Sequence, residues 1–343
     1  MRKPKDKDFF ETKERLIFCV VGYLHPPEAY TAYLKYRSDR RGKWVGNGVR
    51  YHRMIREYSA AQVHSSSDWL RQRYPEYLVH CPVRGIEFPL VPRNRVLRYC
   101  IPETRLAEVL DNPQDALEVK AGRLVNHIVD STGVPVSKFG VTGSILLGTH
   151  NPRFSDINIV VLGDANARVI RESIDSIYEK ELEPYSLREI EIWQQKRAQL
   201  LGISDEYKDR IVFPQWFRGR IDGTPFHLHP TRSDDEITME YGDEYYTALE
   251  PVELTATISD DSESLFAPAN FGIEDVTLLD GPSKAPRITK IVSYEGIFAG
   301  SVGQGNRVRA RGILERVKDK KGRILRYQVV IGTFSTKGWI VAL

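Results

Sequence analysis

The 343-residue sequence predicts an α+β protein in which a helix-containing mixed sheet lies between two β-rich regions. Three observations support this prediction. Apolar residues recur at helical spacing between residues 115 and 203, a strand–turn–helix pattern falls inside that region, and β-branched or aromatic runs dominate both ends of the chain. Helices gathered in one region, with strands in others, are typical of α+β rather than alternating α/β folds.

Chain length and proline positions suggest three domains. A chain of this length exceeds one average core, and prolines cluster between residues 82 and 102. We therefore expect a basic β-rich N-terminal domain over residues 1–102 and a mixed central domain over 103–235. A β-rich C-terminal domain over 236–343 follows, for which a small barrel of the OB type is one candidate.

Composition points to an ordinary globular protein, with 41% hydrophobic residues, 28% charged residues and three cysteines. The cysteines are odd in number and never spaced as C-x-x-C, so they form neither a complete disulfide framework nor a zinc knuckle. No apolar run approaches the roughly 20 residues of a membrane helix, and the first ten residues are charged where a signal peptide is apolar. These features predict a cytoplasmic protein without a membrane partner.

Charge is strongly partitioned along the chain. The net charge is +10 for residues 1–100, −4 for 101–200, −13 for 201–280 and +10 for 281–343. Two basic ends around an acidic middle predict a nucleic-acid partner that is bound through the N- and C-terminal regions. The alternative is that the basic ends dock on the acidic segment of the same chain.

In the N-terminal region we expect a charged, frayed start and then a buried strand in residues 16–24, LIFCVVGYL. Between residues 28 and 58, tyrosines and Trp44 alternate with lysines and arginines. Aromatic rings that stack on bases, interleaved with cations that meet phosphates, are what a single-strand-binding surface needs. An aromatic-rich sheet with solvated basic edges would produce the same pattern.

The central region reads as a helix from Asp115 to about Ser131, ended by Gly133, and then a strand in KFGVTG. Two helices are expected between residues 164 and 203, separated by Pro184, and a hairpin turning at Asp222-Gly223. Near the C-terminus, residues 308–334 read as two strands joined by a turn at 319–322.

Residues 138–162, KFGVTGSILLGTHNPRFSDINIVVL, carry the most specific chemical pattern. A Gly-Ser turn at a strand end, here Gly143 and Ser144, offers backbone N–H groups and a hydroxyl to phosphate oxygens. About a dozen residues later, Asp156 and Asn158 stand at alternate positions of a strand, where both side chains share one face and can ligate a metal ion.

This ordered combination resembles the signature of the DNA polymerase beta nucleotidyltransferase superfamily, and the whole chain resembles an archaeal branch of predicted nucleotidyltransferases. The resemblance implies a nucleotidyltransferase-like mixed sheet over about 115–232 and a nucleoside triphosphate as partner. It assigns Gly143 and Ser144 to the triphosphate and Asp156, with Asn158, to a catalytic Mg²⁺ or Mn²⁺.

Two positions depart from the family pattern. The second metal-binding carboxylate falls on Asn158, whose uncharged amide oxygen would bind a dication more weakly. The third carboxylate should lie on the strand PFHLHP, where Phe226 and Leu228 share one face and His227 and His229 the other. A histidine there could act as a general base or ligate a softer metal, although nearby residues offer no zinc set. Asp222 is the alternative third acid.

Three arginines are candidate phosphate ligands: Arg153, in the loop before Asp156, and Arg218 and Arg220, on the expected hairpin. Each could equally be a solvated surface charge.

The sequence leaves two candidate functions. The chain is either a nucleotidyltransferase that moves a nucleoside monophosphate to an acceptor such as a nucleic-acid 3′ end, or a catalytically degenerate member that binds nucleotide or nucleic acid, as a subunit of a larger complex.

Overall fold

The structure is a computed structural model that describes residues 2–55, 60–178, 182–282, 286–334 and 336–343. The chain divides into two compact units, and each is described by itself. The first comprises Met1–Arg56, Pro89–Tyr185 and Gln215–Thr238, and the second comprises Glu57–Phe88, Ser186–Pro214 and Met239–Leu343. Within the described ranges, no helix combines the length and apolar character needed to cross a membrane.

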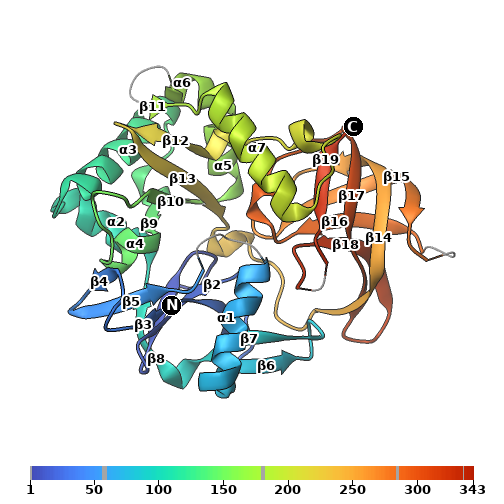
Figure 1. Cartoon of the computed structure of the whole chain (residues 1–343), viewed down its shortest axis with the longest axis horizontal. Coiled ribbons are helices and arrows are strands. Elements are labelled where there is room, and N and C mark those ends of the chain that lie inside the picture. Colours follow the sequence, from blue (N-terminus) through green and yellow to red (C-terminus); the bar gives the residue numbers. More distant parts are fainter. Residues whose placement is uncertain (1, 56–59, 179–181, 283–285, 335) are drawn as a thin grey trace. The chain divides into compact units, whose positions relative to one another are not determined.

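The first unit contains an antiparallel sheet built mostly from the N-terminal region (Figure 1). Its strands in sheet order are β4 (Trp44–Gly46), β5 (Val49–Arg53), β3 (Ala29–Ser38), β2 (Leu16–Val20), β1 (Phe9–Thr12) and β8 (Val96–Cys100). The end of β7 (Ile86–Pro92) pairs with the start of β3. Strands β1 and β2 are buried along their whole length, including Glu11 and Thr12 of β1.

The same unit contains a mixed sheet that carries the Gly-Ser turn. Its order is β11 (Leu182–Glu183), β12 (Arg218–Ile221), β13 (Thr224–Thr231), β10 (Ile157–Leu162) and β9 (Phe139–Thr142). Strands β10 and β13 are parallel, and the other pairs are antiparallel. Asp222 (φ 45°) and Gly223 (φ 69°) form the predicted turn between β12 and β13, which needs positive φ at both positions.

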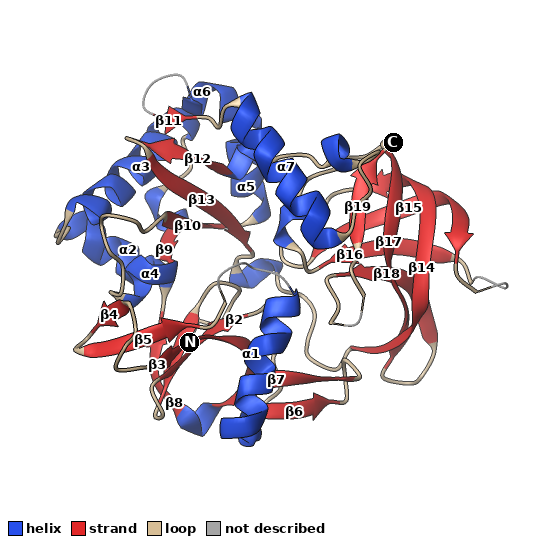
Figure 2. Cartoon of the chain, in the orientation of Figure 1, coloured by secondary structure: helices blue, strands red, loops and turns tan. Residues whose placement is uncertain are grey.

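Helices accompany the mixed sheet (Figure 2). They are α2 (Pro102–Asp111), α3 (Ala116–Thr132), α4 (Gly143–Leu147), α5 (Asp164–Glu172) and α6 (Ile174–Tyr178). The predicted long helix is confirmed as α3: the Asp115 side chain accepts hydrogen bonds from the amides of Leu117 and Glu118, and Gly133 ends the helix at φ 71°. The predicted α+β class is confirmed by these helices and sheets.

The second unit contains a closed barrel. Its strands are β14 (Glu244–Asp260), β15 (Ala269–Asp280), β16 (Ile288–Ser293), β17 (Arg307–Asp319), β18 (Ile324–Ile331) and β19 (Trp339–Ala342). Their order is β14-β15-β16-β18-β17-β19, and an additional β14–β17 pairing closes five of them. Helix α7 (Leu187–Leu201) contributes Ala198 and Leu201 to the apolar core of the barrel. The unit also contains α1 (Ala60–Arg73) and β6 (Leu78–Cys81), which pairs with β7.

The start of the chain is charged as expected, but the expectation that it is frayed was wrong for residues 5–8. Lys5, Asp6 and Asp8 are 3%, 4% and 0% exposed. Arg2 and the Tyr99 hydroxyl donate to the Asp8 carboxylate, so its charge is compensated inside the fold. A charged run is solvated only when no other segment supplies partners, and the sequence pattern did not show that partners exist.

Candidate nucleotide site

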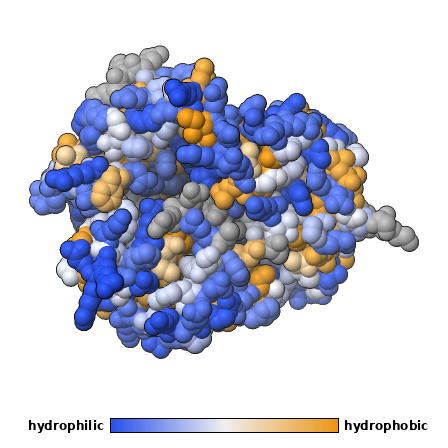
Figure 3. All heavy atoms as spheres, in the orientation of Figure 1, coloured by the Kyte–Doolittle hydropathy of each residue, from blue (hydrophilic) through white to orange (hydrophobic). Residues whose placement is uncertain are grey.

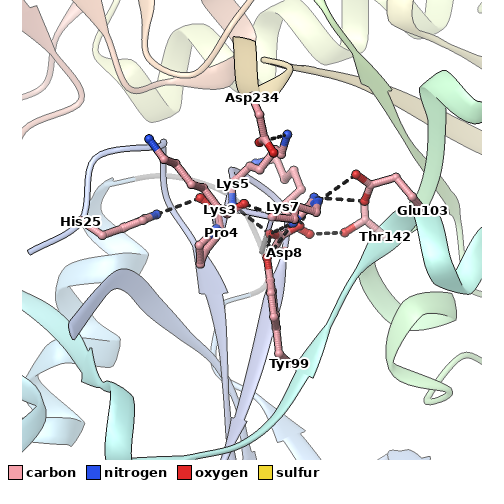
Figure 4. Close-up of polar contacts among 11 residues, drawn as sticks. Lys3, Pro4, Lys5, Lys7, Asp8, His25, Tyr99, Glu103, Thr142 and Asp234 are labelled. Atoms are coloured by element: carbon pink, nitrogen blue, oxygen red, sulfur yellow. Dashed lines mark hydrogen bonds and ion pairs between the residues drawn. The ribbon is translucent and has the colours of Figure 1, made fainter. Parts of the chain in front are cut away.

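The Gly-Ser turn follows β9 directly. Gly143 has φ 67°, a left-handed conformation that favours glycine, and Ser144 is buried at the start of α4. The hydroxyl of Thr142, the last residue of β9, donates to the Lys7 carbonyl oxygen at 2.7 Å. Figure 4 shows this contact together with the Lys5–Asp234 ion pair and the Asp8–Tyr99 hydrogen bond. The N-terminal segment therefore lies against the strand end that carries the turn.

The start of β10 lies beside the turn. Asn158 pairs with Thr142 across the antiparallel β9–β10 ladder. A Cβ atom placed on Gly143 would lie 3.4 Å from Asn158 Nδ2, which shows how closely the turn approaches this side chain. Asp156 comes one residue before β10, and its side chain is 43% exposed. The two predicted phosphate residues and the two predicted metal positions are thus neighbours in space.

The third strand brings both histidines to the same face. In the parallel ladder His227 lies opposite Asn158, whereas Phe226 and Leu228 point to the other side and are each 2% exposed. His229 Nε2 lies 2.9 Å from Asn158 Oδ1, so the imidazole N–H donates to the amide oxygen. His227 Nδ1 lies 3.8 Å from Asp156 Oδ2. Asp156, Asn158, His227 and His229 therefore form one polar group, which we call the site face.

Both imidazoles of the site face are neutral near pH 7. Burial, followed by the nearby Arg218 charge, lowers the pKa of His227 to about 4, although Asp156 opposes the shift. The pKa of His229 is well below its usual range, chiefly because the ring is buried and then because Lys7 and other cations lie near it. A neutral His227 beside a carboxylate can accept a proton, whereas His229 is committed to Asn158.

Cations from the N-terminal region lie close to the site face, and the sequence did not indicate this. Lys35 of β3 is 2% exposed, and its pKa is well below its usual range because of burial and the Arg53 charge, with Asp156 acting in the opposite direction. Lys7 influences the same group. The available signal was a lysine inside the strand-like run AYTAYLKY, but its partner strand could not be deduced.

The donor set does not fit the pair of metal ions used in nucleotidyl transfer. Within the described ranges, no three or more His, Cys, Asp or Glu side chains are grouped so that they could hold a metal ion. The site face has one carboxylate, and the oxygen of Asn158 already accepts the hydrogen bond from His229. Divalent magnesium prefers several oxygen ligands with compensating charge, and these residues supply little of either.

The three candidate arginines lie in different surroundings. Arg218 pairs with His227 across the β12–β13 ladder and so lies at the site face. Arg220 instead places its guanidinium carbon 4.2 Å from the centre of the Tyr185 ring. Arg153 is exposed in the loop before Asp156, and its amide donates to the Asn151 side chain. Of the three candidates, Arg218 is the one that pairs with a histidine of the site face, and Arg153 lies in the loop that leads to Asp156.

Asp222 is not part of the site face. It lies in the β12–β13 turn, and its carboxylate accepts a hydrogen bond from Arg123 at 2.6 Å. His150, to which no role was assigned, places Nε2 2.8 Å from Asp115 Oδ2 and so ties the loop after α4 to the start of α3. Both contacts are structural links between elements of the unit.

Comparison with known proteins agrees with this geometry. The sequence model of the nucleotidyltransferase domain matches residues 125–230, which contain the turn, β10 and β13. The chain is 30% identical over 340 residues to the uncharacterized protein MJ1086 of Methanocaldococcus jannaschii, and the match covers 96% of each chain. The chain belongs to the nucleotidyltransferase superfamily. No solved structure matches this nucleotidyltransferase-family protein.

Proposed function

We propose that this nucleotidyltransferase-family protein binds nucleotide phosphates and nucleic acid without catalysing metal-dependent transfer. The observation that supports the proposal best is the 2.9 Å hydrogen bond between Asn158, at the expected second acid position, and His229, on the strand expected to carry the third. Loss of one preorganised electrostatic contact commonly costs about 3 kcal/mol of transition-state stabilisation. Loss of two would leave a site that retains phosphate-binding geometry but has little catalytic power.

The phosphate-binding part of this proposal rests on the turn. The backbone at Gly143 and Ser144 can donate N–H groups to phosphate oxygens, and Arg153 and Arg218 add positive charge at the two sides of the site. We propose nucleic acid as the larger partner, because the two ends of the chain are basic. The five-stranded closed barrel supports a further domain of the OB type, a class that often binds oligonucleotides.

The predicted three-domain division and the cytoplasmic location remain part of the proposal. Cys19, Cys81 and Cys100 are buried thiols, which suits a reducing compartment. A protein of this kind would act as a binding subunit within a larger assembly, with residues 1–102 and 236–343 contacting the partner.

An assay of nucleotide incorporation tests the proposal. Purified full-length protein is incubated with labelled NTPs, Mg²⁺ or Mn²⁺, and a panel of RNA and DNA acceptors, with Asp156→Ala as the control. We expect no incorporation above the control. In parallel, nucleotide affinity measured with EDTA should stay within about twofold of that with Mg²⁺, because the site face offers few metal ligands. Sustained incorporation that Asp156→Ala abolishes would refute the proposal.

An active transferase is the second candidate, and one observation favours it. Asp156 keeps a half-exposed carboxylate beside the turn, with the neutral imidazole of His227 3.8 Å away as a possible proton acceptor. In that case His227→Gln should lower turnover more than it lowers nucleotide affinity. Equal loss of both quantities would argue against a role in proton transfer.

A further inference from the structure

An aromatic pair with one exposed ring lies in the loop before Asp156 and the strand that packs on it. Phe154 is 58% exposed, and its ring centre lies 5.4 Å from that of Trp44 in an edge-to-face arrangement. Trp44 belongs to β4 of the N-terminal sheet, whereas Phe154 belongs to the loop between α4 and β10. We call Trp44, Phe154 and the basic residues around them the aromatic ledge.

Packing between β4 and the loop, and hydrogen bonds within the loop, fix the two parts of the aromatic ledge. A Cβ atom on Gly46 would lie 2.6 Å from Thr149 Cγ2 and 2.8 Å from the Gly148 carbonyl oxygen, so β4 packs directly on the loop. In the loop, the Phe154 and Ser155 amides donate to the Asn151 carbonyl oxygen. A large aromatic ring that is more than half exposed on such an ordered loop is available to stack with a ligand.

Positive charge is concentrated in the segment that carries Trp44. Residues 37–53 contain six arginines and lysines and one acid, Asp39, which is paired with Arg37. Exposed cations in this segment include Arg40, Arg41 and Lys43, and Arg153 is exposed next to Phe154. Arg50 is also exposed, but it pairs with Val45 and so lies on the face of the β4–β5 hairpin opposite to Trp44. The guanidinium carbon of Arg53 lies 5.7 Å from the centre of the Trp44 ring. Figure 3 shows a strongly hydrophilic surface over β4 and β5, at the lower left.

The ledge also leads to the site face. Phe154 precedes Asp156 by two residues, and Gly148, which packs on β4, ends the helix that begins at Gly143. A chain of phosphates and bases lying along the ledge would therefore have one end close to the turn. Duplex DNA or RNA would not expose its base faces to an aromatic ring, whereas a single strand would.

We propose that the aromatic ledge binds single-stranded nucleic acid, with a base stacked on Phe154 and phosphates on Arg40, Arg41, Lys43 and Arg153, so that one end of the strand points to Asp156. This inference rests on the proposed function and specifies where the nucleic acid lies. A protein partner fits less well, because the apolar part of the ledge is small and the cations are many.

Fluorescence anisotropy with labelled 12-mer oligo(U) and oligo(dT) tests the ledge in the full chain. Phe154→Ala should weaken binding by about 5- to 150-fold, the effect of losing one base–aromatic stack. The matched control is Leu187→Ala, which removes an 80% exposed apolar side chain from α7 and should leave affinity unchanged. Wild-type affinity in Phe154→Ala, or tighter binding of a duplex of equal length, would overturn the proposal.

The charge contribution is tested separately. Arg40→Gln with Arg41→Gln should reduce the slope of log affinity against log salt by about 1 to 1.5, since each single-strand phosphate contact contributes about 0.7. Arg188→Gln with Lys196→Gln removes two exposed cations from α7 and should leave the slope unchanged. An unchanged slope in the first pair, or an equal change in both pairs, would count against the ledge.

Photocrosslinking of the wild-type protein to an oligonucleotide with one 5-iodouracil decides the question even if a variant fails to fold. Crosslinks on Phe154 or Trp44 support the ledge, and crosslinks confined to other residues refute it. Failure of the ledge is distinct from failure of the proposed function. Incorporation of NTPs would refute the binding-only function while leaving the ledge as an acceptor site, whereas wild-type binding by the ledge variants would leave the incorporation result unaffected.

Discussion

The two sides of the candidate nucleotide site differ in how closely they follow the nucleotidyltransferase pattern. On one side, β9 ends in Gly143 and Ser144, with the left-handed backbone that the turn needs. On the other side, Asn158 stands at the expected second acid position and bonds to His229, on the strand expected to carry the third acid. The comparison teaches that the backbone feature and the charged feature are separable. A glycine turn is required to join β9 to α4, whereas carboxylates are required only by a metal ion.

The largest effect should come from the turn. Gly143→Val places a β-branched residue at φ 67° and close to Asn158, so we expect a loss of about 2–3 kcal/mol in unfolding free energy. Nucleotide binding should also fall below detection. Gly223→Val is the matched control, because Gly223 has φ 69° and open space around it. It should be destabilised while still binding nucleotide, as measured by urea unfolding and calorimetric titration. Nucleotide binding by folded Gly143→Val would contradict the role of the turn in nucleotide binding.

Acidification should lower the free energy of unfolding because His227 and His229 have lowered pKa values in the fold. An unfolded histidine has a pKa near 6.5, whereas the pKa of His227 in the fold is about 4 and that of His229 is also lowered. Below pH 6.5 the unfolded chain therefore binds more protons, so stability falls as pH decreases from 6.5 toward 4. For His227 alone the loss between pH 7 and 5 is about 2 kcal/mol. The double variant His227→Gln, His229→Gln should show a flatter profile, and an equally steep profile would contradict the assignment.

Removal of the donor to Asn158 should have a smaller effect. His229→Phe leaves the partly buried amide oxygen of Asn158 without its hydrogen bond, which should cost about 1 kcal/mol in unfolding free energy. His229→Gln keeps an N–H donor and should recover part of this loss. If both variants are equally stable, the hydrogen bond contributes nothing measurable and ring packing alone sets the stability.

The smallest expected effect comes from restoring an acid at position 158. Asn158→Asp adds a second carboxylate at the i+2 position after Asp156, so Mg²⁺ should strengthen nucleotide binding about tenfold in this variant. The wild-type protein should respond by less than twofold. Titration of nucleotide with and without Mg²⁺ measures both. The prediction fails if Mg²⁺ strengthens binding equally in the two proteins.

Much of the central region was predictable because its signals are local. Asp115 and Gly133 bound α3 through capping preferences, and Asp222-Gly223 specify a hairpin turn through positive φ. The pairing of the Gly-Ser turn with the strand after Asp156 followed from family resemblance. The assignment of these residues to a functional site remains a prediction.

The contributions of the N-terminal region could not be read from the sequence. Lys35 and Lys7 influence the pKa of His229 only because the N-terminal sheet and the mixed sheet belong to one compact unit. Such long-range contacts depend on which faces meet, and periodicity within each segment does not specify that. The contact of Trp44 with Phe154 was missed for the same reason. The sequence shows Trp44 in a basic stretch and Phe154 two residues before Asp156, but it does not show that the two rings meet.

The hydrogen bond from Thr142 to Lys7 has a practical consequence for anyone who excises the central region. A recombinant fragment starting at residue 103 would lose the acceptor for Thr142, the cation that faces Asp234, and the whole strand that bears Trp44. Inactivity or insolubility of such a truncation would report the missing neighbours rather than the chemistry of the remaining residues. Biochemical work should therefore begin from the intact polypeptide.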